Sequence, residues 1–456
     1  MSASASYSEA SLDTTIFTKP TSPISTRSTV SDSELEKFHS HDRATALFFY
    51  VNLGFSFIIG IAGLLNGYIK IDAEDFTRKF ASITTIDTFV TVVLAVGLSL
   101  LSLKLFKRKP MLMLHLTNVV AIFLLIALAI VVNIFLNPIM AMLLGIVVMI
   151  WLGVYWKFRS YFFVSSALIK LVTIVSDSNF GVYSVLVVTL LVSYYYSFFF
   201  LLSTYAFLVF LDEGAHSVLT KTTTCVYLVA CYLWNMQVFL QTSRTIIATV
   251  YDQYFNEDST LKMSLPQIIR LALTKYFGSI CSGAKLVLPI ASIRWYTLVL
   301  LGLPSNSSFM AVSARNYNYY AFNNIIAKRM SYRAAANLVW DDIQRTGVIN
   351  LIDHSYISTM FGKCSVAISL ISALAAALVL YISDPTMNVV LLLFEGVLQA
   401  FVVSYTISVA IFQIIDVGTS SIFVVLAQNS KGIQRKHPHL LDAITSHYHI
   451  TSTLPR

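Results

Sequence analysis

Long apolar runs alternate with short polar segments along most of this chain. The first three runs cover 44–68, 84–104 and 111–136, and each is long enough to cross a bilayer as a helix. The hydrocarbon core of a membrane is about 30 Å thick, a distance that roughly 20 helical residues span. The pattern therefore predicts an all-α, polytopic membrane protein.

Continued along the chain, the pattern predicts about ten membrane-spanning helices in one domain over 41–428. The other seven spans are expected at 138–157, 180–211, 223–250, 275–303, 308–328, 357–382 and 388–427. A partly polar segment at 160–178 fits a helix lying at the membrane interface, with a re-entrant or core helix as the alternative. Its apolar face would consist of Phe162, Phe163, Leu168, Leu171 and Val172.

Both ends of the chain depart from the apolar pattern. Residues 1–40 are rich in Ser and Thr, which predicts a disordered tail because such a segment buries too little apolar surface to offset its ordering entropy. Residues 429–456 are expected to form a second polar tail. The start lacks the features of a cleaved signal peptide, so we expect the first spanning helix to direct insertion.

Composition excludes a water-soluble fold, since 56% of the residues are hydrophobic, 12% are charged and the mean hydropathy is +0.72. The net charge of +8 is concentrated in alternate loops, around 104–109, 157–170, 328–345 and 431–436. Loops with excess Lys and Arg face the cytosol, so both termini are expected there. The charge thus reports orientation, with some attraction to anionic lipid, and no nucleic-acid partner is expected.

Ionisable side chains inside the predicted spans are candidates for function, because hydrocarbon tolerates them only when protein or water shields them. They are Arg244, Lys285, Arg294, Arg315, Glu395 and Asp416. Glu395 lies deep in its span, so we expect it to face the bundle interior. Arg294 and Arg315 could instead reach the headgroups from helix ends. Asp416 could equally form a structural pair with Arg244 or a lysine.

Aromatic residues offer a second kind of candidate site. Faces such as those of Trp234, Tyr319 and Tyr320 can hold a quaternary ammonium group through cation–π attraction. Ordinary lipid-facing packing or an interfacial belt is the alternative. Gln237, close to Trp234 at helical spacing, could line a cavity or hydrogen-bond to another helix.

Small residues mark the expected start of the seventh span. Gly278, Ser279 and Gly283 would let helix backbones approach closely or let the helix break locally. We expect Gly278 and Ser279 near a substrate pathway. Gly283 and Gly418 are expected to serve helix packing.

Chemistry of the soluble-enzyme kind is not expected. The four cysteines fall in apolar spans without metal-ligand spacing, and no nucleotide loop or nucleophile motif is found. The sequence therefore predicts no metal, no cofactor, no catalytic residue and no enzymatic activity. Asn306 begins a weak glycosylation motif on the expected non-cytosolic side.

Several of these segments together resemble the choline transporter-like family, in particular its fungal branch. The likeness rests on residues 278–283 followed by Arg294, on residues 318–321, and on Gly418 with residues 422–424. The resemblance implies ten spans, cytosolic termini and, for some members, transport of choline or a related ethanolamine. Lys285 departs from the family pattern, and its charge would repel choline if it faced the pathway.

Two functions follow from this reading. The first is transport of a small organic cation or zwitterion such as choline or ethanolamine, with Trp234 and Tyr319 or Tyr320 caging the cation. Glu395 would supply the opposite charge or carry a coupling proton. The full expected substrate pathway comprises Trp234, Gln237, Arg244, Gly278, Ser279, Tyr319, Tyr320 and Glu395.

The second function is a non-transporting membrane organiser of vesicle traffic or autophagy, which would act through trafficking proteins bound to its cytosolic tails. In either case the partners include the lipid bilayer. The expected location is the plasma membrane or an endomembrane such as that of the Golgi, endosome, vacuole or autophagic vesicle.

Overall fold

The computed structural model describes most of the chain, in ranges separated by short gaps. These ranges are 32–70, 81–135, 138–213, 218–256, 263–285, 287, 290, 315–355, 357–383 and 397–445. Every regular element in them is a helix, which confirms the predicted fold class.

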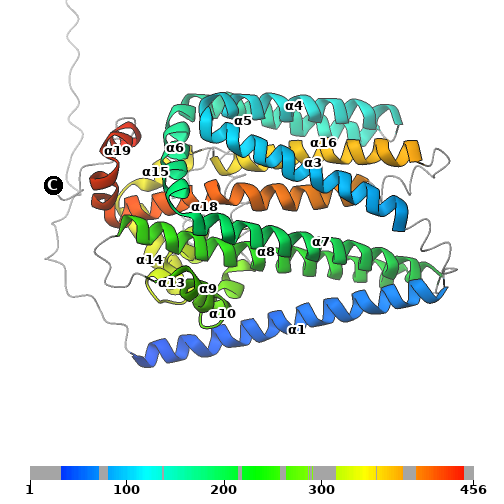
Figure 1. Cartoon of the computed structure of the whole chain (residues 1–456), viewed down its shortest axis with the longest axis horizontal. Helices are drawn as coiled ribbons and strands as arrows, with labels where there is room; N and C mark the ends of the chain where they lie inside the picture. The colour runs from blue at the N-terminus through cyan, green and yellow to red at the C-terminus, as the bar shows by residue number, and fades with distance from the viewer. Residues whose placement is uncertain are drawn as a thin grey trace, which may run out of the picture.

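Eight long helices run side by side along the long axis of the molecule (Figure 1). They are α1 (Asp32–Lys70), α3 (Ala81–Arg108), α4 (Pro110–Phe135), α5 (Pro138–Phe158), α7 (Phe180–Glu213), α8 (Val218–Phe255), α16 (Ile357–Ser383) and α18 (Gln399–Lys436). Within the described ranges, 8 helical stretches are long and apolar enough to cross a membrane. The chain is an integral membrane protein.

Local sequence explains where several helices begin. Proline is the first residue of α4 and α5, where its missing N–H would lack an intrahelical partner anyway. Their apolar residues lie on all sides, as expected for helices in lipid. By contrast, α18 lies in the middle of the bundle, flanked by α16, α3, α7 and α8. In the most apolar part of α18, 89% of the residues are buried, whereas the share is 6% in that of the span containing α5.

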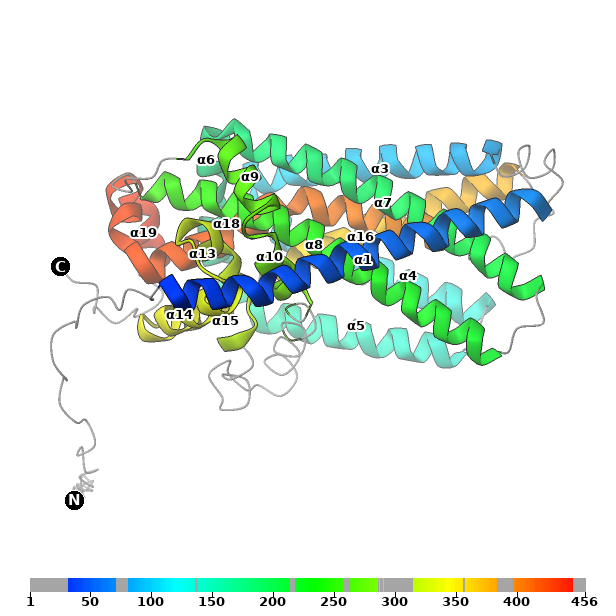
Figure 2. The same ribbon diagram turned by 90° about the horizontal axis from the view of Figure 1, so that it is seen from below.

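Helix α1 lies along one side of the bundle, where it packs against α7 and α10 (Phe277–Ala284) (Figure 2). It begins at Asp32, so the expected disordered tail is helical over 32–40. Residues 1–31 lie outside the described residues.

A group of short helices gathers at one end of the bundle (Figure 1). They are α9 (Leu265–Leu273), α10, α13 (Phe322–Ala327), α14 (Tyr332–Arg345), α15 (Val348–His354) and α19 (Pro438–Thr445). The junctions rich in Lys and Arg, at 107–109 and 157–159, lie at the same end. By the positive-inside rule, we expect this end to face the cytosol.

Helix α6 (Phe162–Ser178) runs across that end of the bundle, at a steep angle to the long helices (Figure 1). Its buried side packs against α18, α19 and α4. The helix therefore lies at the end of the spans and is also covered by protein. The expected apolar face is buried except for Phe163, which is 51% exposed. At 100° per residue, Phe163 lies across the helix from Leu168 and Val172, so it was wrongly assigned to that face.

The predicted spanning helix at 308–328 is wrong over its described part. Residues 319–327 form the turn η3 (Tyr319–Ala321) and the six-residue helix α13. The Asn318 side chain starts the turn by accepting a hydrogen bond from the Ala321 N–H at 2.9 Å. Arg329, at φ 55°, ends the segment in the left-handed region. Polar capping therefore keeps this segment short, although most residues between its two ends are apolar.

Tyr332 holds the turn η3 against α14. Its hydroxyl accepts from the Asn318 N–H at 3.0 Å and donates to the Asn318 carbonyl oxygen at 3.2 Å. Burial raises the pKa of Tyr332 well above its usual value, so the hydroxyl keeps the proton that it donates. Of the predicted span at 275–303, the described helix is the eight-residue α10, and the later part lies mostly outside the described residues.

The C-terminal segment is folded as far as Thr445, where the sequence suggested a polar tail. Helix α18 continues past a kink at Asn429 to Lys436, and α19 follows it. The Asn429 side-chain amide donates to Asn256 Oδ1 at 2.5 Å, and Tyr254 approaches His437 Nε2 at 3.2 Å. These contacts fasten the segment to the end of α8.

Candidate functional site

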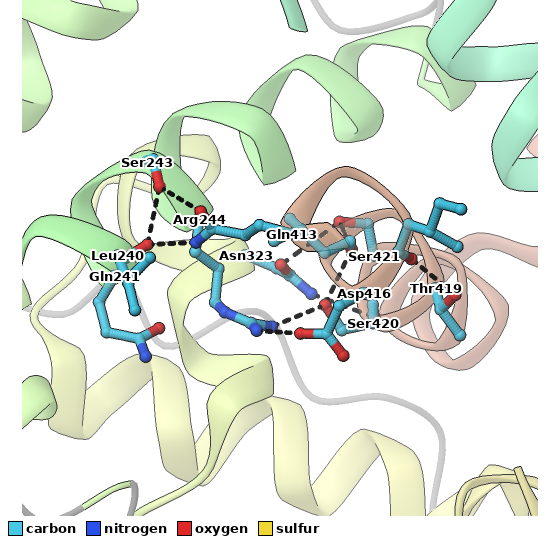
Figure 3. Close-up of polar contacts among 12 residues, drawn as sticks. Leu240, Gln241, Ser243, Arg244, Asn323, Gln413, Asp416, Thr419, Ser420 and Ser421 are labelled. Atoms are coloured by element: carbon cyan, nitrogen blue, oxygen red, sulfur yellow. Dashed lines mark hydrogen bonds and ion pairs between the residues drawn. The ribbon is translucent and has the colours of Figure 1, made fainter. Parts of the chain in front are cut away.

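A cluster of polar side chains lies buried where α8 and α18 face each other (Figure 3). We call it the α8–α18 cluster. It comprises Gln241, Ser243, Arg244, Gln413, Asp416 and Ser420, with Asn323 from α13. Gln413, Asp416 and Ser420 follow one another at helical spacing, so they share one face of α18.

An ion pair forms the core of this cluster. Arg244 Nη2 donates to the Asp416 carboxylate, and Arg244 Nη1 donates to Ser420 Oγ at 3.3 Å. The Arg244 side chain is 9% exposed and that of Asp416 is 23% exposed. This is the Arg244–Asp416 pairing that the sequence left open as one alternative. Two opposite charges held so far from water stabilise each other, and neither is tolerated there alone.

Neutral hydrogen bonds extend the cluster across three helices. Ser243 Oγ donates to Gln413 Oε1 at 2.8 Å, and the Gln413 amide donates to the Leu240 carbonyl oxygen at 2.5 Å. The Asn323 amide donates to the Ser420 carbonyl oxygen at 3.2 Å. The cluster therefore ties α8 and α13 to the central helix α18.

Tyr319 supplies an aromatic face to the cluster. The guanidinium carbon of Arg244 lies 5.0 Å from the Tyr319 ring centroid, within the range of a cation–π contact. Tyr320 instead packs against Phe423 of α18, with ring centroids 6.4 Å apart. Of the two predicted cage tyrosines, Tyr319 is thus the one that faces the ion pair, and a protein cation occupies that face.

Two buried polar atoms of the α8–α18 cluster have no hydrogen-bond partner among the described residues. They are the donor Arg244 Nε and the acceptor Gln241 Oε1. The Gln241 amide nitrogen donates to Gln237 Oε1 at 3.2 Å, which places the predicted residue Gln237 at the edge of the cluster. The Gln241 and Arg244 side chains extend in the same direction (Figure 3). A hydroxyl group or a water molecule could satisfy both free atoms, since each can donate and accept.

Trp234 does not join this cluster. The ten residues from Trp234 to Arg244 correspond to about 15 Å along α8. Trp234 packs against Phe48 and Phe49 of α1, with ring centroids 5.4 and 5.8 Å apart. One small cation therefore cannot contact both Trp234 and Tyr319, so the structure separates the two parts of the predicted cage.

The predicted glycines lie at close helix contacts. A Cβ at Gly278 would overlap the Asp42 carbonyl oxygen of α1, and the Ser279 hydroxyl donates to the Asp42 carboxylate. These two residues therefore join α10 to α1. A Cβ at Gly283 would overlap the Tyr332 ring, and one at Gly418 would overlap Val172. Neither position has room for a side chain unless its neighbour moves.

Other predicted residues lie elsewhere. Arg315 pairs with Asp341 at 2.9 Å, and both side chains are 53% exposed, so Arg315 is a surface residue. Glu395, Arg294 and Asn306 lie outside the described residues. No group of three or more metal-binding side chains occurs in the described ranges.

A small cavity lies between α1, α7 and α8, away from the predicted pathway residues. It measures about 10 Å³, room for a single water molecule. Its walls are formed by Ser56, Ile59, Gly60, Tyr196, Phe199, Phe200 and Leu228. Beside it, the Asn235 amide donates to the Tyr196 hydroxyl at 2.6 Å and accepts from Asn52 at 3.2 Å. The polar residue Asn235 thus serves contacts between helices.

Lys363 is a buried charged residue that the sequence reasoning missed. It belongs to α16 and is 2% exposed. Its ammonium group donates to Asn118 Oδ1 of α4 at 2.9 Å and lies 4.8 Å from the Trp151 ring centroid of α5. A lysine within the apolar run 357–382 was the signal that could have revealed it.

Replacing Lys363 with Met should lower the stability of the protein by about 1–2 kcal/mol, because it removes the buried donor to Asn118 Oδ1. Lys363→Arg keeps a donor and a cation there and serves as the matched control. Thermal unfolding in detergent would measure the difference. A Lys363→Met variant as stable as the wild type would show that the contact contributes nothing.

Comparison with known proteins places the chain among related membrane proteins. Residues 142–431 match the sequence profile of a family described as plasma-membrane choline transporter. This match covers more than half of the chain, and it includes the α8–α18 cluster and Lys363.

Individual relatives are more distant. Protein PNS1 of Gibberella zeae is 28% identical over 239 residues, which cover 47% of this chain and 43% of that protein. Protein PNS1 of Saccharomyces cerevisiae is 24% identical over 261 residues, or 51% of this chain and 47% of the relative. A CTL-like protein of Dictyostelium discoideum is 20% identical over 247 residues, or 50% and 43%. The chain thus spans less than half the length of each of these relatives.

Proposed function

This chain belongs to the plasma-membrane choline transporter family, and from that membership we propose that it carries a small organic cation or zwitterion across a membrane. Choline and ethanolamine are the first candidates. The observation that supports the proposal most is the Arg244–Asp416 pair, buried between two membrane-spanning helices. Charged groups in such a position face a bundle interior or a solute path.

The α8–α18 cluster contains the two groups that attract an organic cation. An aromatic face, that of Tyr319, binds a methylated ammonium group, which cannot be held by hydrogen bonds. A carboxylate, that of Asp416, supplies the opposite charge. In the structure Arg244 engages both groups at once.

We infer that the substrate cation competes with Arg244 for Tyr319 and Asp416. Binding would then break the ion pair, and that pair is one of the contacts that fasten α8 to α18. Loss of a contact between two spanning helices lets one move against the other, which alternating access requires. A zwitterion would in addition place its anionic end on the released guanidinium group.

Uptake of labelled choline into vesicles that contain the purified full chain tests this function, over a range of pH gradients. Uptake above that of empty vesicles is expected, and Asp416→Asn should reduce it at least tenfold. Asp341→Asn, which changes an exposed pair, is the matched control and should retain uptake. Signals equal to those of empty vesicles with both choline and ethanolamine would refute the transport proposal.

One observation favours the alternative, a membrane organiser that does not transport. Protein cations occupy two of the three aromatic faces that were expected to hold a substrate, with Arg244 on Tyr319 and Lys285 on Trp234. An organiser should keep its trafficking partners in cells when Asp416 is changed to Asn. Co-purification of trafficking partners with the wild type and with Asp416→Asn, together with no measurable uptake, would favour this second function.

A further inference from the structure

The protein itself pairs some of the basic residues at the expected cytosolic end and leaves others unpaired. Lys107 forms an ion pair with Asp177 at 2.6 Å. Arg345 forms one with Asp342 at 3.0 Å. Three exposed cations form no ion pair with any residue that the structure describes, namely Arg108, Lys109 and Arg159. The tertiary structure therefore selects which cations are left for a ligand outside the chain.

The unpaired cations come from two neighbouring junctions of the chain. One is the turn between α3 and α4 at 108–110, and the other is η2 (Arg159–Tyr161), which joins α5 to α6. His115 of α4 connects the two junctions. Its Nδ1 lies 3.2 Å from the Tyr155 hydroxyl of α5, and its ring centroid lies 4.9 Å from that of Phe162 of α6. Because α4 packs against α3, α5 and α6, the two junctions form one corner of the bundle.

Trp156 and Arg159 give this corner a face on the lateral side of the bundle. The Trp156 side chain, near the end of α5, is 58% exposed, and tryptophan at the end of a span lies at the level of the lipid headgroups. The guanidinium carbon of Arg159 lies 4.2 Å from the Trp156 ring centroid. Arg159 is therefore held at headgroup depth. Phe163, at the start of α6, adds a second exposed aromatic ring to the corner.

An arginine stacked on an aromatic ring is well suited to a phosphate group. Stacking fixes the guanidinium plane, and its N–H groups can then bind two phosphate oxygens at once. No described residue accepts a hydrogen bond from the Arg159 side chain, so its N–H groups are available. We propose that this corner binds one anionic phospholipid of the leaflet at this end of the bundle.

The corner site consists of Arg108, Lys109, Trp156, Arg159 and Phe163. Arg159 binds the lipid phosphate, and the two aromatic rings contact the apolar part of the lipid below it. The other two cations attract the net negative charge of the headgroup, which a zwitterionic lipid lacks. The site differs from a general attraction of basic loops to lipid, because one lipid occupies one place. Helix α5 packs mainly against α4, so the corner site is separate from the α8–α18 cluster and independent of transport.

Binding of phosphatidylserine to the purified full chain in detergent, counted by native mass spectrometry, tests the corner site. Arg159→Gln should bind the first phosphatidylserine about tenfold more weakly than the wild type, the loss expected for a charge-assisted hydrogen bond. Arg345→Gln is the matched control, since it removes an exposed cation elsewhere at the same end, and it should bind like the wild type. Arg159→Lys keeps the charge but loses the planar fork, so it should also bind more weakly than the wild type.

Equal binding by Arg159→Gln and the wild type would overturn the proposal. An equal loss in Arg159→Gln and Arg345→Gln would overturn it too, because the lipid would then respond only to net charge. Trp156→Leu repeats the test without a change of charge and should weaken binding, since it removes the surface on which Arg159 stacks. All these side chains are exposed, so the lipid-free variants should melt at the same temperature as the wild type.

A competition arm separates the lipid from a soluble phosphate compound. Glycerophosphoserine has the same headgroup without acyl chains, and it should not displace phosphatidylserine at equal concentration. Displacement would assign the corner to a soluble ligand and overturn the lipid site. Phosphatidylcholine should compete poorly, because its headgroup carries no net charge, and equal competition by it would likewise contradict a site for anionic lipid.

Discussion

Replacing Asp416 with Asn should destabilise the protein by about 3 kcal/mol, because Arg244 would remain charged and buried without its counter-charge. We expect the lower end of the usual range for buried pairs, since the Asp416 side chain is 23% exposed. Arg244 would keep Ser420 Oγ and the Tyr319 face, but neither carries a negative charge. The melting temperature of the purified protein in detergent would show the loss.

Two controls make this result specific. Asp341→Asn breaks the exposed pair with Arg315 and should change stability by less than about 1 kcal/mol. The double variant Arg244→Met/Asp416→Leu removes both charges and should recover much of the loss, because no uncompensated charge is left. If Asp416→Asn were no less stable than Asp341→Asn, the ion pair would not be a buried one.

Replacing Gly278 with Ala should destabilise the protein by up to about 3 kcal/mol, the upper end for overpacking. The added Cβ would overlap the Asp42 carbonyl oxygen, a backbone atom that cannot turn away. Helices α1 and α10 would have to separate, and the hydrogen bond from Ser279 to Asp42 would be lost with their contact. Thermal unfolding measures this effect.

Gly54→Ala is the matched control, since it lies in α1 and a Cβ there meets no atom within 4 Å. This change should raise stability slightly, because alanine favours a helix over glycine by about 1 kcal/mol. The two substitutions are chemically identical, so opposite signs would assign the difference to the α1–α10 contact. Equal effects of the two would contradict the close packing described here.

The spanning helices could be predicted well because the relevant signal is local. The apolar runs at 84–104, 111–136 and 138–157 correspond to α3, α4 and α5, with ends that differ by a few residues. The prediction of a spanning helix at 308–328 was wrong for a local reason too. The Asn318 side chain caps the turn η3 by accepting a hydrogen bond from the Ala321 N–H, and this cap interrupts the expected helix.

The candidate site was harder to predict, because its members come from distant parts of the chain. Helical periodicity places Gln241 and Arg244 on one face of α8, but it does not say which helix lies opposite. Arg244 and Asp416 are separated by 172 positions, and Trp234 lies closer to Arg244 in the chain than Tyr319 does. Tyr319 nevertheless faces Arg244, and Trp234 lies against α1.

The amino-acid sequence by itself determined that this is an all-α protein of the membrane and which residues are charged within its spans. Length and polarity decide those properties, and each stretch of chain carries them independently of the rest. Only the tertiary structure decided that Arg244 neutralises Asp416, that Lys285 lies against Phe48 and Trp234, and that Lys363 contacts Asn118. A buried charge is stabilised by whatever lies within a few ångströms of it, and that neighbour is set by how the helices pack.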